Sequence, residues 1–274
     1  MKKKILVTGG SGFIGINAIN NFLDKNYEVI NIDIVPPKIP NHIIHWRNVD
    51  IRDYKTLLTE VQKFLPDYIL HLAARTDLNG KNIDEYNSNT LGTQNIVNIC
   101  NEVRTVKRVL FASSMLVNSV GSSPLSLSDY SPDTSYGESK VEMERIILTS
   151  KLKAEWAIIR PTSIWGPWFG EPYSNFFNFV INGMFVHPGD KACTKTYGYI
   201  DNSVFQISAL LLTAKKSLIG GQIFYIGDKP PINISDWADE ISIQNNGTRN
   251  KKVYFLVFKV GALIGDLLKL LNVK

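Results

Sequence analysis

The chain has little of what defines several large classes of protein. Its 274 residues include two cysteines, Cys100 and Cys193, which are too few for a disulfide framework and show no metal-ligand spacing. His42, His45 and His71 show no metal-ligand spacing either. We therefore expect no metal site, and we expect both cysteines to be buried thiols.

Long apolar runs and clusters of positive charge are also missing. No stretch reaches the length of a membrane span, and the apolar part of the start, MKKKILVTGG, is too short and too glycine-rich for a signal peptide. The net charge of +5 is not gathered into a Lys/Arg cluster with interleaved aromatics, so nucleic-acid binding is not expected. The mild positive excess favours anionic ligands. A cytoplasmic globular protein is the expectation.

What the sequence does contain is a regular alternation of short apolar runs with segments of helical period. Strands are expected at residues 3–9, 27–34, 67–74, 107–114 and 154–162, and helices at residues 13–26, 54–66, 89–103 and 135–150. Such alternation implies right-handed crossovers and a parallel sheet covered on both faces. The predicted fold class is therefore α/β, a doubly wound parallel sheet of the Rossmann type.

The alternation weakens after Pro161, where a second region begins. Residues 163–194 are rich in Trp, Phe, Gly and Pro and predict a loop-rich lobe. We expect a first domain over residues 1–162, to which segments within about 195–230 return. A smaller substrate-binding lobe is expected mainly over residues 163–274, interleaved with the first domain.

Regular patterns return towards the end of the chain. A strand is expected at residues 221–227 and a helix after Asn233 or Ser235, followed by a polar break at 245–252. The tail from Val253 is strongly apolar, with charges and glycines interspersed. It fits the core of the lobe, a partner-binding helix, or an amphipathic helix on a membrane surface. The interspersed charges and glycines favour the first two.

The stretch LVTGGSGFIGINAI carries the clearest motif. It fits G-x-x-G-x-x-G at Gly9, Gly12 and Gly15, between a predicted strand and a predicted helix. Gly9 suits a tight turn, Gly12 lets a pyrophosphate approach the backbone, and Gly15 lets the helix pack closely. The helix start, with Phe13 and Ile14, offers N–H groups to phosphates. A plain glycine-rich turn is the structural alternative.

Asp33 supplies a second, independent signal. It ends the second predicted strand, about twenty residues beyond the glycines, where a carboxylate accepts hydrogen bonds from the adenosine ribose and repels a 2′-phosphate. We therefore expect NAD as the cofactor in preference to NADP. A loop or helix cap is the alternative role for this aspartate.

The segment SYGESK places Tyr136 and Lys140 four residues apart on a predicted helix, so that both side chains share one face. A neighbouring ammonium stabilises a phenolate and lowers the tyrosine pKa from its usual value near 10, which suits proton transfer at neutral pH. Ser113 and Ser114 end the preceding predicted strand, at the edge where ligands bind in a doubly wound sheet. A surface tyrosine and a solvated lysine are the alternative.

Two further features have both structural and functional interpretations. The first is a group of aromatic residues that would either wall a pocket or pack the lobe, namely Trp165, Trp168, Phe169, Tyr173, Phe176 and Phe177. The second is His187, which fits an ordinary loop histidine better than a contact to a diphosphate.

Jointly, these motifs make the chain resemble an extended short-chain dehydrogenase/reductase, of the NAD-dependent epimerase/dehydratase type that acts on nucleotide sugars. The matching segments are TGGSGFIG, NIDI, VDIRD, HLAA, NTLGTQN, FASS, YGESK, RPTSIWGP, YGYIDN and IFYIGD. The resemblance extends to about residue 241, and related proteins often run further, so the chain is expected to be a truncated member.

The resemblance implies a role for particular residues. Ser114, Tyr136 and Lys140 would be catalytic, with Tyr136 as the acid/base and Lys140 also holding the nicotinamide ribose. Asn89 would lie near the nicotinamide. The residues implied to bind the cofactor are Gly9, Gly12, Phe13, Ile14, Gly15, Asp33, Asp50, Ile51, Leu72, Ala73, Ala74, Tyr136, Lys140 and Pro161.

The resemblance also implies a homodimer that is paired through the helix bearing Tyr136 and the helix that begins near Asn89. The apolar residues expected to supply that face are Val141, Ile146, Ile147 and Leu148.

Departures from the family pattern narrow the range of reactions that we expect. Sugar 4,6-dehydratases carry an Asp–Glu pair after the catalytic serine or threonine, but here these places hold Met115 and Leu116, which argues against dehydration. The leading hypothesis is an epimerase or ketoreductase of a nucleotide-diphosphate sugar. A dehydrogenase of a hydrophobic alcohol, such as a steroid or terpenoid, and a non-catalytic cofactor sensor remain as alternatives.

Overall fold

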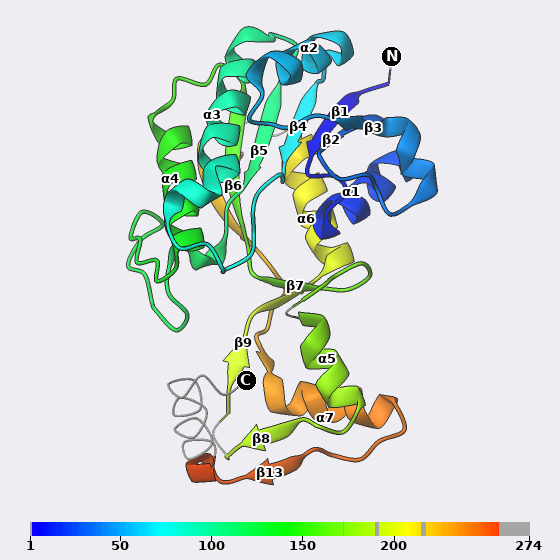
Figure 1. Cartoon of the computed structure of the whole chain (residues 1–274), viewed down its shortest axis with the longest axis vertical. Coiled ribbons are helices and arrows are strands. Elements are labelled where there is room, and N and C mark those ends of the chain that lie inside the picture. The colour runs from blue at the N-terminus through cyan, green and yellow to red at the C-terminus, as the bar shows by residue number, and fades with distance from the viewer. Residues whose placement is uncertain (1, 172, 190–191, 215–217, 258–274) are drawn as a thin grey trace. The chain divides into compact units, whose positions relative to one another are not determined.

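A computed structural model describes residues 2–171, 173–189, 192–214 and 218–257 (Figure 1). The chain divides into two compact units, which are described separately. The first unit contains Met1–Trp168 and Gly198–Asp228, and the second contains Phe169–Tyr197 and Lys229–Lys274.

The first unit is built on a seven-stranded parallel sheet with the order β11-β6-β5-β4-β1-β2-β3. Its strands are β1 (Lys4–Thr8), β2 (Glu28–Asp33), β3 (Trp46–Asn48), β4 (Tyr68–His71), β5 (Arg108–Ala112), β6 (Glu155–Pro161) and β11 (Gln222–Ile226). The order reverses between β1 and β4, which is the point where ligands bind in doubly wound sheets. The predicted fold class is confirmed.

Helices cover both faces of this sheet. They are α1 (Phe13–Asp24), α2 (Tyr54–Phe64), α3 (Asn87–Glu102), α4 (Ser135–Thr149) and α6 (Ile200–Leu212), with the short 3₁₀ helices η1 (Pro40–His45), η2 (Ile83–Tyr86) and η3 (Met115–Val117). One buried core joins the sheet to α2, α3 and α4, and the other joins it to α1 and α6. Figure 1 shows α3 beside α4 and α1 beside α6. The unit also holds β7 (Ser163–Trp165), and the chain re-enters it through β10 (Tyr197–Tyr199).

Helices α2 and α4 begin at side-chain caps that the sequence provides. Asp53 accepts a hydrogen bond from the Thr56 amide at the start of α2, and Thr134 accepts one from the Gly137 amide at the start of α4. The Thr134 cap sets the residue at which α4 begins. It therefore also sets the place of the predicted Tyr–Lys pair near the start of this helix.

The second unit is smaller and packs around aromatic rings. Its elements are α5 (Tyr173–Ile181), β8 (Val186–Pro188), β9 (Thr194–Lys195), β12 (Ile232–Asn233), α7 (Ile234–Gln244) and β13 (Lys251–Val253). The rings of Phe176, Phe177 and Tyr197 lie 5.4, 5.3 and 4.7 Å from that of Trp237. Of the predicted aromatic group, Phe176 and Phe177 therefore pack this unit, whereas Trp165 and Trp168 belong to the first unit, where Trp168 is exposed. The side chain of Tyr173 lies outside the described residues.

Several expectations from the sequence are corrected here. Residues 163–194 contain a helix, α5, where a loop-rich lobe was expected, and α6 was not predicted at all. Cys100 is buried as expected, but Cys193 is exposed. His187 lies in β8, not in a loop, and is buried. Of the tail, residues 258–274 lie outside the described residues.

The expected dimer face is also partly wrong. Val141 and Ile147 are both buried within their own unit, and Ile147 belongs to the core between α4 and the sheet, so neither side chain is free to supply a surface face. Ile146 packs partly against the same core, and Leu148 is exposed.

Candidate active site

The glycine-rich turn joins β1 to α1 at the carboxyl end of β1. Gly9 has φ of +70°, and a Cβ added there would lie 2.6 Å from the backbone nitrogen of Ala73. A Cβ added to Gly15 would collide with the backbone of Gly9 and Gly10, so only glycine allows α1 to pack on the turn. A Cβ on Gly12 would meet only the Gly9 carbonyl oxygen, at 3.3 Å, so this side of the turn is open.

The open side of the turn suits a bound pyrophosphate. The first N–H groups of an α-helix have no partner within the helix, and Gly12, the N-cap residue of α1, has no side chain that could cap them. The helix start therefore presents backbone donors and a partial positive charge. This donor set fits the pyrophosphate of a dinucleotide.

Asp33, the predicted ribose-binding residue, lies beside the glycine turn. It ends β2, and its two carboxylate oxygens accept hydrogen bonds from the Ser11 and Val35 amides, each at 3.0 Å. Asn31 fixes the same turn, because its side-chain oxygen accepts a hydrogen bond from the Gly10 amide at 2.9 Å. Each oxygen of Asp33 keeps further acceptor capacity, so ribose hydroxyls fit here as well.

Other predicted cofactor residues also follow the carboxyl ends of strands. The Leu72 and Ala73 amides, just beyond β4, donate to the backbone and hydroxyl oxygens of Thr8, and Ala74 follows them. Pro161 ends β6. All of them therefore lie at the edge of the sheet where ligands bind.

Asp50 and Ile51, predicted to bind the cofactor, follow β3. The Asp50 side chain pairs with an arginine, whereas the Ile51 side chain is buried. The Arg52 side chain hydrogen-bonds to the carboxylate of Asp50 and lowers the pKa of Asp50 below its usual range. The Ile51 side chain is buried in the core, where a Cβ on Gly92 would collide with it. A contact of Ile51 with an adenine would therefore use its backbone.

Helix α4 places the predicted catalytic pair together. Tyr136 and Lys140 are both nearly buried, and the Lys140 ammonium nitrogen lies 6.0 Å from the centre of the Tyr136 ring. Lys140 Nζ donates a hydrogen bond to the carbonyl oxygen of Ala112, the last residue of β5, at 2.8 Å. Burial lowers the pKa of Lys140 to about 8, although the negative charge of Glu144 opposes this shift.

Ser114 lies two residues beyond the carbonyl group that Lys140 holds. It is the N-cap of η3, and its Oγ accepts a hydrogen bond from the Leu116 amide at 3.1 Å. The hydroxyl proton is not used in this bond, so Ser114 can donate it to a substrate oxygen. The strand end and the helix thus bring Ser114 to the side of the sheet that carries Tyr136.

A buried histidine, His71, lies at the end of β4 near this set, and the sequence did not assign it a role. Thr8 Oγ1 lies 2.8 Å from its Nδ1, and Thr93 Oγ1 lies 3.3 Å from its Nε2. Thr93 donates its own proton to the Asn89 carbonyl, so His71 carries its proton on Nε2. Burial, with a further contribution from Lys140, lowers the pKa of His71 to about 3, so the ring is neutral.

The side chain of Asn89 hydrogen-bonds to Arg75 and Ser139. Its amide nitrogen donates to Ser139 Oγ at 2.9 Å and to the Arg75 carbonyl at 3.0 Å, and its oxygen accepts from the Arg75 amide at 2.8 Å. The side chain therefore ties the segment after β4 to α4, the helix of Tyr136.

Two further residues, which the sequence analysis did not single out, lie close to Tyr136 or to one of its neighbours. The ring of Tyr86 lies 6.0 Å from that of Tyr136, and the Arg75 guanidinium lies 4.9 Å from the centre of the Tyr86 ring. Arg75 also pairs with Asp77 and Glu85. No spacing rule points to these contacts, because they depend on how the segment from 75 to 86 folds over α4.

The second unit has polar features of its own. His187 Nε2 lies 2.9 Å from Asp239 Oδ1.

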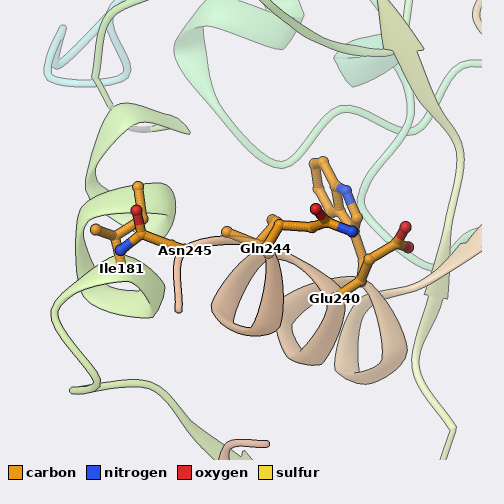
Figure 2. A pocket seen from close by; sticks show the side chains of 6 residues that line it. Ile181, Glu240, Gln244 and Asn245 are labelled. Carbon is orange, nitrogen blue, oxygen red and sulfur yellow. The ribbon is translucent and has the colours of Figure 1, made fainter. Parts of the chain in front are cut away.

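A pocket of about 380 Å³, shown in Figure 2, lies between α5 and α7. It is lined by Ile181, Trp237, Glu240, Ile241, Gln244 and Asn245, none of which belongs to the predicted catalytic or cofactor set. In the described residues, no group of His, Cys, Asp and Glu side chains is arranged to hold a metal ion.

Comparison with known proteins agrees with this geometry. The profile of the NAD dependent epimerase/dehydratase family matches residues 5–227. The chain is 29% identical to a 3-beta-hydroxysteroid dehydrogenase of Mycolicibacterium neoaurum, over 88% of this chain and 69% of that protein. It is 25% identical to the UDP-glucose 4-epimerase of Vibrio cholerae, over 89% and 76% of the two chains.

Among solved structures, the fold is similar to that of a UDP-glucose 4-epimerase from Thermus thermophilus in complex with NAD. The TM-score is 0.72 at 20% identity, over 91% of this chain and 85% of the other.

The reversed strand order and the open glycine turn define a dinucleotide-binding protein with a doubly wound sheet. The family match covers most of the chain and includes every predicted catalytic residue. The chain belongs to the NAD dependent epimerase/dehydratase family, and its cofactor is NAD.

Proposed function

We propose that the protein is an NAD-dependent epimerase or ketoreductase of a nucleotide-diphosphate sugar, with Tyr136 as the acid/base. The observation that carries this proposal is the nearly buried Tyr136–Lys140 pair, with the ammonium nitrogen 6.0 Å from the ring centre, beside the strand end of Ser114. Similarity to a UDP-glucose 4-epimerase supports the substrate class.

The proposed chemistry moves one hydride and one proton. NAD, when bound, supplies a hydride acceptor at nicotinamide C4. Tyr136, as the phenolate, takes the proton of the substrate hydroxyl while the carbinol carbon loses its hydride, so that an alcohol becomes a ketone. Ser114 donates a hydrogen bond to the same oxygen. In an epimerase, Tyr136 would then return the proton as the ketone is reduced from its opposite face. A ketoreductase would start from the reduced cofactor, NADH, and carry out only the reduction, with Tyr136 donating the proton.

Lys140 has two proposed roles. Its cation stabilises the Tyr136 phenolate, and its nitrogen holds the nicotinamide ribose. Dehydration is not part of the proposal, because η3 places Met115 and Leu116 where an eliminating acid is needed.

A second substrate class, a hydrophobic alcohol, has an observation in its favour. The loop between Ser114 and α4 exposes three apolar side chains, Val120 at 73%, Leu125 at 96% and Leu127 at 44%. Similarity to a 3-beta-hydroxysteroid dehydrogenase supports this alternative.

A ligand screen separates these possibilities. Melting temperature is measured with NAD present, against a panel of nucleotide-diphosphate sugars and a panel of steroid alcohols, and each stabilising compound is then tested for turnover. Turnover of a nucleotide sugar supports the proposal, and turnover of a steroid alcohol supports the alternative. A chain that binds NAD but turns over neither class would act as a cofactor sensor.

We further propose a homodimer in the cytoplasm, with the second unit as the substrate-binding lobe. The unpaired cysteines fit a reducing compartment. No helix in the described part of the chain is long and apolar enough to cross a membrane.

A further inference from the structure

One turn beyond Lys140, helix α4 carries a carboxylate that is fully buried, Glu144. Its Oε1 accepts hydrogen bonds from Ser113 Oγ at 2.5 Å and Arg160 Nε at 2.9 Å. Its Oε2 accepts hydrogen bonds from the Tyr130 hydroxyl at 2.8 Å and Arg160 Nη2 at 2.7 Å. Both carboxylate oxygens are therefore fully used.

Its partner, Arg160 of β6, is also 0% exposed and extends the network. Its Nη2 donates to the Leu127 carbonyl at 2.7 Å, and its Nη1 donates to the Tyr225 hydroxyl at 3.1 Å. The guanidinium lies 5.5 and 5.4 Å from the ring centres of Tyr130 and Tyr225. The pair thus joins α4, β6, β11, the end of β5 and the loop before α4.

Stability alone does not account for such a pair. Replacing a buried ion pair by apolar side chains of similar volume is often neutral or stabilising, because two charges must be desolvated. What distinguishes Glu144 is its place: it lies four residues from Lys140 on the same face of α4 and binds Ser113, the neighbour of Ser114.

We propose that Glu144 is a positioning residue for the catalytic set: it fixes the strand end carrying Ser114 against the helix of Tyr136 and Lys140, and it supplies the anion that Lys140 faces. The identity of the catalytic set rests on the proposed function. The contacts of Glu144 and its effect on Lys140 do not.

The charges around Lys140 make this role specific. Among the described residues, the titratable groups that face it are Tyr136 and Glu144 on its own helix and His71 on β4. His71 is neutral because its pKa is about 3. Glu144 is therefore the anion that opposes the effect of burial on the pKa of Lys140. Arg160 faces Glu144 from β6. Once the Glu144 charge is removed, Lys140 should lose its proton at a lower pH.

The chain offers a matched control at the other end of the same two strands. Arg108 and Glu155, the first residues of β5 and β6, form a second ion pair, with Arg108 Nη2 2.8 Å from Glu155 Oε2. Their side chains are 3% and 13% exposed. Glu155→Gln therefore leaves a buried arginine unpaired, as Glu144→Gln does, but away from Lys140.

The test follows the titration of Lys140 directly. Protein labelled with ¹³C at the lysine ε-carbon is titrated by NMR in the wild type, Glu144→Gln and Glu155→Gln, and the Lys140 signal is assigned by its loss in Lys140→Met. We expect Glu144→Gln to move the Lys140 titration down by about one pH unit. Glu155→Gln should lower the melting temperature without moving that titration.

An unchanged Lys140 titration in folded Glu144→Gln would overturn the proposal. If Glu144→Gln does not fold, the double variant Glu144→Gln/Arg160→Met removes both buried charges, and the Lys140 titration should move in the same direction. If Lys140 titrated at the same pH in the double variant as in the wild type, the proposal would likewise be overturned.

Turnover tests the positioning role separately, once a substrate is known. The alkaline limb of kcat for ketone reduction should move to lower pH in Glu144→Gln, with KM unchanged, and should not move in Glu155→Gln. The NMR titration needs no substrate, so a failure of the proposed function and a failure of this inference give different results.

Discussion

At the scale of single residues, burial decides the charge state on which the proposed chemistry depends. Lys140 is 3% exposed, and its pKa is lowered from 10.5 to about 8 because water is excluded from the ammonium. It is therefore still mainly cationic at neutral pH and becomes neutral only above about 8. His71, buried nearby, stays neutral over this whole range.

This charge state predicts a pH dependence. Ketone reduction needs the Tyr136 proton beside a cationic Lys140, so the rate should be level at neutral pH and fall as the pH rises through about 8. The measurement is kcat for NADH-dependent reduction from pH 6 to 10. A rate that stays constant beyond pH 9 would show that Lys140 does not act as a cation.

Asp33 sets the predicted choice between the two dinucleotides. Its carboxylate is held at the glycine turn by the Ser11 and Val35 amides, and we expect it to repel a 2′-phosphate there. Fluorescence titration should show tighter binding of NADH than NADPH. Asp33→Asn should reduce that preference by about tenfold or more. Asp24→Asn, at the exposed end of α1, is the control and should leave the preference unchanged. Equal affinities of the wild type for NADH and NADPH would contradict the predicted role of Asp33.

At the scale of elements, local signals were enough to predict most of the first unit. The glycine turn, β2 with Asp33, and α4 with its Tyr–Lys pair each follow from residues within one short segment. Helix α6 was missed although Ile200, Val204, Ile207 and Leu211 are buried at helical spacing, so a signal was present.

Other elements gave weaker signals or none. Helix α5 was missed because its aromatic residues, such as Phe176 and Phe177, are adjacent and show no clear period; their packing on Trp237 of α7 stabilises it. The Glu144–Arg160 pair and the Tyr86–Tyr136 contact join separate elements, so no local pattern reveals them.

Helix α1 provides the clearest test of an element's packing. A Cβ on Gly15 would collide with the backbone of Gly9 and Gly10, which cannot move without displacing the turn. Gly15→Ala should therefore lower the free energy of unfolding by about 1–3 kcal/mol and weaken NADH binding. Gly170→Ala is the control, because nothing lies within 4 Å of a Cβ at that position. Equal stabilities of the two variants in denaturant unfolding would contradict this packing.

At the scale of the whole molecule, the predicted homodimer needs an exposed apolar face. Val141 and Ile147 do not supply it, but Leu91 of α3 and Leu148 of α4 are 46% and 44% exposed. Light scattering should show a dimer at micromolar concentration, and the double variant Leu91→Glu/Leu148→Glu should be monomeric. Ile43→Glu, at a residue 47% exposed on η1, should remain dimeric. A monomeric wild type would end the dimer proposal.

The family match and the strand order establish an NAD-dependent fold, and the acid/base role of Tyr136 is the central proposal for the whole molecule. The most direct test compares turnover and NADH binding in the wild type, Tyr136→Phe and the control Tyr27→Phe, with the substrate found in the screen. Tyr136→Phe should lower kcat by about 10²–10⁴-fold with NADH affinity nearly unchanged, because the ring still packs but the ionisable hydroxyl is gone. Wild-type turnover in Tyr136→Phe would contradict the proposed mechanism.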